Sequence, residues 1–255
     1  MSERLRLLIR LTLDDRAART RSTLLGPYWA VLLPLVESGL FTLVFVVVVG
    51  VRAVPGPYLL FVYIGTLAWR TFARGVGAAA TSLPRAARLL QQMPVGANVV
   101  VTAAVAGAML DGLLGVPLLV AVIAVWRGLP SLGAIALWLP VALALQISVT
   151  LGLGYVVATA NVFYRDVGLA LGPVLNILMF AAPVVYSTSL VPVSLRSLFL
   201  ANPMAAAIDS YRAGLLGAVA VPWASLAAAA AVAALSLMAG VGALRYLDPR
   251  LREVV

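Results

Sequence analysis

The chain of 255 residues contains no cysteine and no histidine. Disulfide bonds are therefore excluded, and so are metal sites built from cysteine and histidine ligands. Catalytic triads and dyads that depend on histidine or cysteine are excluded for the same reason. Lysine is absent too, so all eighteen basic residues are arginines and a phosphate-binding loop that needs Gly-Lys cannot occur.

Acidic residues are also scarce. The nine Asp and Glu residues are scattered along the chain apart from Asp14 and Asp15, which leaves no clustered carboxylate site for Mg²⁺. We therefore expect no covalent chemistry, no metal and no cofactor in this chain. The net charge of +9 would suggest nucleic acid as the partner of a soluble protein. Here the positions of the arginines indicate a membrane instead, and no nucleic-acid partner is expected.

What the chain has in abundance is apolar sequence. Hydrophobic residues make up 63% of it, charged residues 11%, and the mean hydropathy is +1.07. Soluble domains are about half apolar and about a quarter charged. Several apolar runs exceed the roughly 18 residues that a spanning helix needs. The sequence does not show the short segments of alternating hydrophobicity that are typical of a membrane β-barrel. The composition therefore predicts an all-α membrane protein.

A single transmembrane domain over residues 1–255 is expected, because no internal repeat or linker is visible. Residues 2–25 are expected to form an amphipathic helix in the membrane interface, within a cytoplasmic segment 1–27. Its Arg side chains would gather anionic lipids or only fix the topology. A bundle of six transmembrane helices then fills 28–247, and a cytoplasmic tail follows at 248–255. The predicted spans are 28–50, 58–80, 98–126, 132–162, 167–190 and 223–247.

Residues 191–222 are too polar for a clean span and are interrupted by Pro192, Pro203 and Pro222. Short re-entrant helices before the last span are expected there, covered by protein or lining a cavity. Twelve arginines fall in the N-terminal segment, the 81–97 loop, the turn at Arg165 and the tail, against four in the opposite loops. Since basic residues accumulate on the cytoplasmic side, both termini are predicted to be cytoplasmic.

Three motifs narrow the function. They are RSTLLGPYWAVLLPL at 21–35, ANVFYRDVG at 160–168 and ANPMAAAIDSYRAGLLG at 201–217. Gly65, Trp69 and Phe72 in the second predicted span add a fourth pattern. In this order and spacing, the set closely resembles the permease subunit of type 2 ABC exporters. The most similar branch exports O-antigen, capsule or teichoic acid, and the resemblance covers nearly the whole chain.

The resemblance implies a non-enzymatic transport subunit in a bacterial plasma membrane. A second permease copy would pair with it, and two separate ATP-binding subunits would bind ATP and Mg²⁺ and hydrolyse the ATP. Membrane lipids and a lipid-linked glycan substrate would complete its partners. Residues implied to dock the ATPase are Arg85, Arg88, Tyr164, Arg165 and Asp166. Residues implied to form an external gate are Asn202, Pro203, Tyr211 and Arg212.

Each of these roles has a simpler alternative. Arg165 is equally explained as a positive-inside anchor, and the gate residues as a packing plug. Neither the identity and length of the substrate nor the choice between homodimer and heterodimer follows from the sequence. The direction of transport follows only from the resemblance.

Charged residues inside the predicted spans form a further candidate site. A charge at the centre of the bilayer costs about 2.5–3.5 kcal/mol on insertion scales, so such groups normally face a cavity or a partner. Arg70 and Arg74 share a helix face and suit phosphate binding. Either this pair borders the substrate path, or Arg70 forms a structural pair with Glu37 or Asp111. The candidate path residues are Glu37, Trp69, Arg70, Arg74 and Asp111.

Other functions remain open. A drug or lipid exporter of the same superfamily would share these features. A secondary transporter working without an ATPase would show internal repeats with broken helices at matching positions, and none is found. A membrane-embedded transferase would need clustered carboxylates, which the sequence lacks.

Overall fold

The computed structural model describes residues 3–20, 24–50, 54, 56–92, 95–217 and 220–254. Every regular element in these ranges is a helix, which confirms the all-α class. Two of the arginines counted above to predict the topology, Arg21 of the N-terminal segment and Arg52 of the opposite loops, lie outside the described residues. The helices are α1 Glu3–Thr20, α2 Trp29–Thr42, α3 Tyr58–Arg85, α4 Ala87–Gln92, α5 Ala97–Leu113, α6 Gly115–Arg127, α7 Leu132–Phe163, α8 Asp166–Leu178, α9 Val193–Ala201, α10 Pro203–Leu216 and α11 Trp223–Val254.

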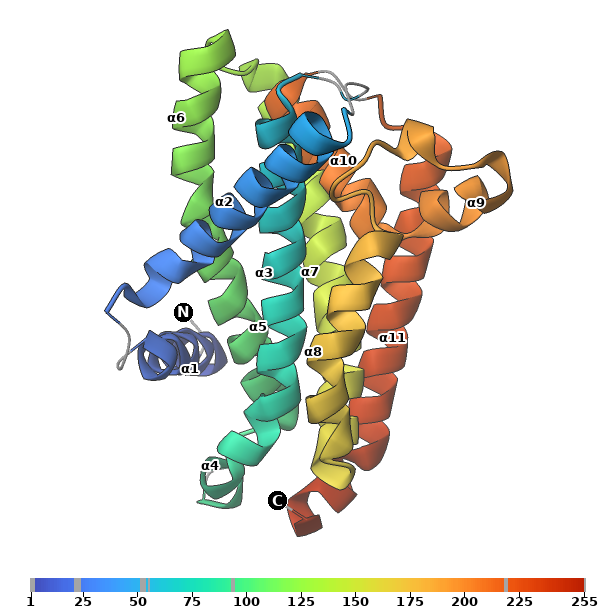
Figure 1. Cartoon of the computed structure of the whole chain (residues 1–255). Coiled ribbons are helices and arrows are strands. Elements are labelled where there is room, and N and C mark those ends of the chain that lie inside the picture. The colour runs from blue at the N-terminus through green and yellow to red at the C-terminus, as the bar shows by residue number, and fades with distance from the viewer. Residues whose placement is uncertain are drawn as a thin grey trace.

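The long helices run side by side, and the short ones lie at the two ends of the bundle (Figure 1). The helix α4, the α7–α8 turn and the C-terminus lie at one end, which we call the α4 end. The helices α9 and α10 lie toward the other end, which we call the α9 end, and α1 runs across the bundle axis. Segments far apart in the sequence therefore meet at the same end.

Four helical segments are long and apolar enough to cross a membrane: Trp29–Val48, Ala97–Trp126, Leu132–Phe163 and Trp223–Leu247. The chain is thus a multi-pass membrane protein. The helix α3 does not qualify because Arg70 and Arg74 lower its mean hydropathy, although most of its residues are buried. The segment Asp166–Ala181 is apolar but shorter.

Glycines let α7 and α11 approach each other closely. A Cβ added at Gly152 of α7 would lie 2.5 Å from the carbonyl carbon of Ser236 in α11. Gly240 of α11 faces the backbone of Gly152 in the same way. Small residues let two membrane helices approach backbone to backbone, where packing contacts replace the missing hydrophobic force. The pair therefore fixes α11 against α7.

One predicted span agrees in its bounds but is divided, and another differs from the structure. The span predicted at 98–126 matches the apolar segment Ala97–Trp126, within which a turn at Leu114 separates α5 from α6. The span predicted at 167–190 is wrong as a continuous helix, because α8 ends at Leu178 and only one short 3₁₀ turn follows it directly. Pro183 accounts for the end, since the residue before a proline is forced out of the helical region, and Ala182 is extended.

The ends of the chain differ as well. The helix α11 continues to Val254, so residues 248–254 of the predicted tail extend this helix beyond the apolar segment Trp223–Leu247. At the other end, α1 confirms a helix in the N-terminal segment, but its apolar side chains do not share one face. Leu7 and Leu11 pack against the core, whereas Ile9 and Leu13 are exposed.

Candidate functional site

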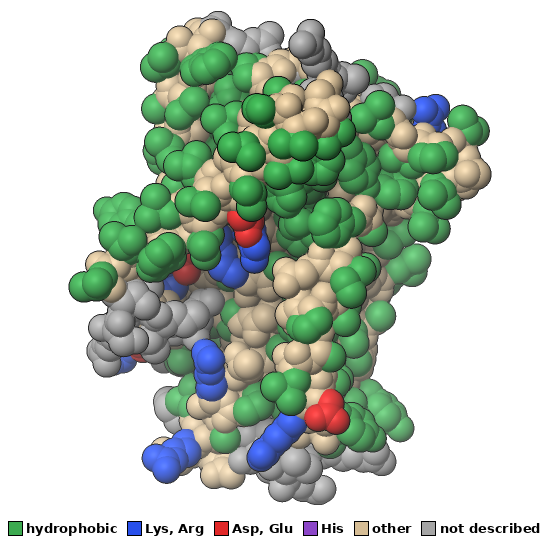
Figure 2. All heavy atoms as spheres, in the orientation of Figure 1, with side chains coloured by type: hydrophobic (Ala, Val, Ile, Leu, Met, Phe, Trp, Pro, Cys, Tyr) green, Lys and Arg blue, Asp and Glu red, His purple; other side chains and the backbone are tan. Residues whose placement is uncertain are grey.

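The residues predicted to dock an ATPase lie together at the α4 end. Arg85 ends α3, Arg88 belongs to α4, and Tyr164 and Arg165 form the turn before Asp166 of α8. All five side chains are exposed, and Tyr164 is 71% accessible. Figure 2 shows charged side chains at this end, below a surface that is otherwise mainly hydrophobic. The two turns thus present exposed charged side chains at the same end of the bundle.

Asn161 holds this surface to the bundle. Its side-chain amide donates to the carbonyl of Ala80 in α3 at 2.9 Å, and its Oδ1 accepts from the amide of Gly168 in α8 at 2.8 Å. A Cβ at Gly168 would lie 2.6 Å from Oδ1, so a larger residue would displace this contact. Asn161 is buried, and it therefore links three helices directly beneath the exposed turn.

The second candidate site brings together Glu37 of α2 and Arg70 of α3. The guanidinium of Arg70 donates from Nε to Glu37 Oε2 at 2.9 Å and from Nη2 to Oε1, which is a bidentate pair. Both side chains remain partly accessible. Arg74 follows on the same face and donates to the carbonyls of Arg70 and Ala30. Figure 2 shows charged groups in a recess below α2.

Trp69 and Asp111 do not join this group. Trp69 is 4% exposed and packs on Phe72 with ring centroids 5.1 Å apart, as part of the core. Asp111 of α5 accepts instead from Arg16 of α1 at 2.7 Å. This ion pair compensates a carboxylate within a spanning segment and holds α1 on α5. Of the two acidic partners considered for Arg70, the structure has Glu37.

The predicted gate contains the most buried charge among the described residues. Arg212 is 0% exposed, and its guanidinium donates to the carbonyls of Phe61, Pro183 and Val184 and to Asp209. The bonds to Pro183 and Val184 are both 2.7 Å long. These carbonyls belong to the segment after α8, where the helix has ended and left them without intrahelical partners. Arg212 therefore satisfies backbone groups that the break exposes.

Two neighbours complete the surroundings of Arg212. Its guanidinium carbon lies 3.4 Å from the ring centroid of Phe61, which is a cation–π contact. Gly65 leaves room for it, because a Cβ there would lie 2.7 Å from the Val184 carbonyl oxygen and 2.9 Å from Arg212 Nη2. The glycine of the predicted second-span pattern thus permits close approach of the irregular segment to α3.

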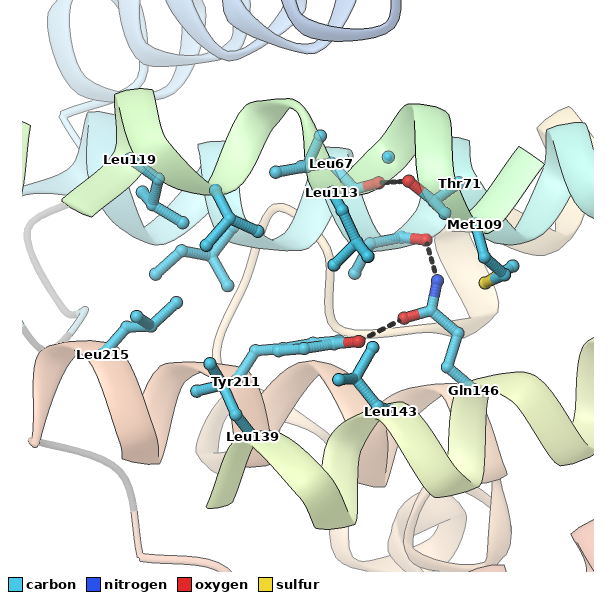
Figure 3. A pocket seen from close by; sticks show the side chains of 14 residues that line it. Leu67, Thr71, Met109, Leu113, Leu119, Leu139, Leu143, Gln146, Tyr211 and Leu215 are labelled. Atoms are coloured by element: carbon cyan, nitrogen blue, oxygen red, sulfur yellow. Dashed lines mark hydrogen bonds between the residues drawn. The ribbon is translucent and has the colours of Figure 1, made fainter. Parts of the chain in front are cut away.

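The other three gate residues stabilise the same region. Asn202 is the N-cap of α10: its Oδ1 accepts from the amide of Met204 at 3.0 Å, and its amide donates to Ala181. Pro203 occupies the first turn, where its missing N–H costs nothing. Tyr211 donates to Gln146 Oε1 at 2.7 Å, and Gln146 donates to Ala68 at 3.1 Å, as Figure 3 shows.

With this geometry in view, the comparisons with known proteins are informative. The family model described as ABC-2 type transporter matches residues 18–216. The chain belongs to the ABC-2 type transporter family. It is 32% identical over 209 residues to the O-antigen export system permease protein RfbA of Myxococcus xanthus, covering 81% of this chain and 79% of that protein. The corresponding RfbA of Klebsiella pneumoniae is 26% identical over 207 residues, with 81% and 78% covered.

In this ABC-2 family member, several residues that shape the sites escaped the sequence reasoning. Each of them is the polar partner of a predicted site residue: Gln146 of Tyr211, Asp209 of Arg212, and Arg16 of Asp111. Polar residues inside apolar runs are the signal that could have found Gln146, because an amide in a membrane helix requires a partner. Their pairing depends on tertiary contacts between helices distant in sequence. Within the described ranges, no three acidic residues come together as a metal site.

Proposed function

We propose that this chain is the membrane-spanning permease of an ATP-driven exporter of a lipid-linked polysaccharide. The family match and the relatives named as O-antigen export permeases support the assignment. The permease would work as two copies with two ATP-binding subunits, which bind ATP and Mg²⁺. The chain itself would carry out no covalent chemistry.

In this proposal, α3 and α8 cross the bacterial plasma membrane together with the four apolar segments, giving six crossings. The α4 end and both termini are then cytoplasmic, as the arginine distribution indicates. The helices α9 and α10 would enter the outer leaflet without crossing it. Arg212 supports this arrangement, since irregular backbone within a membrane requires partners from the protein.

The single observation that carries the proposal for energy coupling is the charged surface at the α4 end. Arg165 and Asp166 are exposed, whereas Asn161 behind them is hydrogen-bonded to both α3 and α8. A force applied by an ATPase to the exposed turn would therefore reach α3, which packs at the centre of the bundle. In the same proposal, the outer gate comprises Asn202, which caps α10, together with Pro203, Tyr211 and Arg212 of α10.

The recess of Arg70 and Arg74 is the part of the molecule that we propose meets the phosphate groups of the lipid carrier. Their guanidinium groups suit phosphate oxygens, and Arg70 is partly accessible despite its pair with Glu37. Trp69 and Asp111 are left out of this path, because one is a core residue and the other is paired with Arg16.

The test is to purify the full chain together with the ATPase encoded beside it and to measure ATP hydrolysis in lipid nanodiscs. A stable complex is expected, and Arg165→Ala or Asp166→Ala should weaken both assembly and hydrolysis. Arg196→Ala provides the matched control, because Arg196 is an exposed arginine on α9 at the other end. Failure of any ATPase to associate would refute the exporter assignment.

A further inference from the structure

A small cavity lies inside the bundle, apart from the charged surface at the α4 end and from the Glu37–Arg70 pair, and Tyr211 of the predicted gate is among the residues that line it. Its volume is about 100 Å³, and its walls come from five helices: α3, α5, α6, α7 and α10. Figure 3 shows the leucines of these helices facing one another across it, with Gln146 and Tyr211 along one side. No charged residue lines the cavity.

Burial distinguishes a closed floor from an open side. Ile64 of α3 and Leu215 of α10 are 2% and 5% exposed, and they form the floor. Leu113 at the end of α5 is 43% exposed, and Val116 of α6 and Leu143 of α7 are partly exposed. The cavity therefore opens between the α5–α6 break and α7. That side belongs to two segments apolar enough to span the membrane, so in the proposed membrane arrangement it faces the lipid.

The polar atoms in the cavity are already bonded to protein. Thr71 Oγ1 donates to Leu67 at 2.7 Å, Tyr211 donates to Gln146, and Gln146 donates to Ala68. An occupant is therefore not required to supply hydrogen bonds. A water molecule needs two to four polar partners to be held in a cavity, which this arrangement does not favour. The chemistry matches a hydrocarbon chain.

We propose that this cavity binds the end of an acyl chain of a membrane phospholipid. It is an intramembrane lipid site within a single subunit, additional to the proposed transport path. The rest of the acyl chain would lie along the exposed surface of Leu113. Because the floor includes Leu215 beside Arg212, the acyl chain would support α10 from the inside.

The driving force is the filling of a void rather than the release of water. Lipid tails and the cavity walls are equally apolar, so no hydrophobic gain arises from the transfer itself. Atoms lining an empty void lose dispersion contacts, which an inserted chain restores. By the usual dependence of stability on cavity volume, a void of 100 Å³ corresponds to a preference on the order of fiftyfold for being filled.

The site is tested with the full-length chain in nanodiscs containing a phosphatidylcholine whose acyl chain ends in a photoreactive diazirine. After irradiation, adducts are mapped by mass spectrometry. We expect adducts on Met109 and Gln146, which line the cavity and are 8% and 2% exposed. Val116→Trp should fill the opening and lower these adducts about tenfold, since it removes most of the void-filling preference. Leu118→Trp is the matched control on the outer side of α6.

Labelling confined to outward-facing residues such as Leu118 in the unmodified chain would overturn the proposal, even if Val116→Trp fails to fold. Equal labelling of Met109 in the two tryptophan variants would overturn it too. Displacement of the label by unlabelled polyprenyl phosphate, but not by unlabelled phosphatidylcholine, would assign the cavity to an isoprenoid chain and reject the phospholipid.

Discussion

At the scale of single residues, Arg212 illustrates how a membrane protein accommodates a charge at 0% exposure. An isolated charge would be very costly there, but this guanidinium donates to three carbonyls and to Asp209. Thr188 donates to the other Asp209 oxygen at 2.6 Å, so the carboxylate is also satisfied. The network thus replaces the backbone hydrogen bonds that end with α8.

Replacing Arg212 by methionine should therefore destabilise the chain by about 3–5 kcal/mol, because it leaves Asp209 and the carbonyls unpaired. Heat unfolding of the purified protein, followed by tryptophan fluorescence, measures the loss. Arg212→Lys should fall in between, since an ammonium cannot reach all the acceptors. Arg196→Met, an exposed arginine of α9, should have little effect. A lysine variant as stable as the original would show that charge alone suffices.

Glu37 and Arg70 offer a residue-scale test that separates structure from transport. Replacing either partner by glutamine should lower stability, because it leaves the other charge unpaired within the bundle. The exchanged pair Glu37→Arg with Arg70→Glu should recover about 1 kcal/mol or more of stability, measured as the coupling in a double-mutant cycle. If Arg70 also contacts the substrate, export should stay impaired in the exchanged variant. Recovery of both properties would reduce the pair to a structural role.

At the scale of elements, the α7–α8 turn depends on one side chain. Asn161→Ala should destabilise the chain by about 1–3 kcal/mol, because the buried carbonyl of Ala80 and the amide of Gly168 lose their partner. Asn161→Asp keeps the acceptor for Gly168 but loses the donor, so it should also destabilise. The midpoint of heat unfolding measures both variants. Asn176→Ala, an exposed asparagine of α8, is the control; equal midpoints for all variants would contradict the linkage.

The elements also show what the sequence could and could not predict. Apolar runs between polar turns placed α3 and α7 within a few residues, since hydropathy reports directly on membrane helices. The end of α8 was missed although Pro183 was visible, because proline is often tolerated inside membrane helices. The partners of the charged side chains were the hardest feature to predict from the sequence. Nothing in the sequence around Asp111 indicates that Arg16, 95 positions away, is its partner.

At the scale of the whole molecule, the proposed topology has α3 and α8 crossing the membrane. Both termini and the α4 end then lie on the same side of the membrane. The absence of cysteine makes this directly testable, because any introduced thiol is unique. Val49 and Leu195 are exposed at 61% and 50%, and Tyr164 and Arg88 are exposed at the α4 end. Val49 precedes α3 and Arg88 follows it, while Tyr164 precedes α8 and Leu195 follows it.

Single replacements of these four residues by cysteine should divide into two classes when intact cells are treated with a membrane-impermeant maleimide. Val49→Cys and Leu195→Cys should react, whereas Arg88→Cys and Tyr164→Cys should react only after the membrane is opened. The unmodified chain supplies a background free of thiols. If Val49 and Arg88 react alike, α3 does not cross; if Tyr164 and Leu195 react alike, α8 does not cross. Two spanning segments lie between Arg88 and Tyr164, so the two charged turns stay on one side in either case. Either result alone would instead put the two termini on opposite sides of the membrane, which would refute the proposed topology.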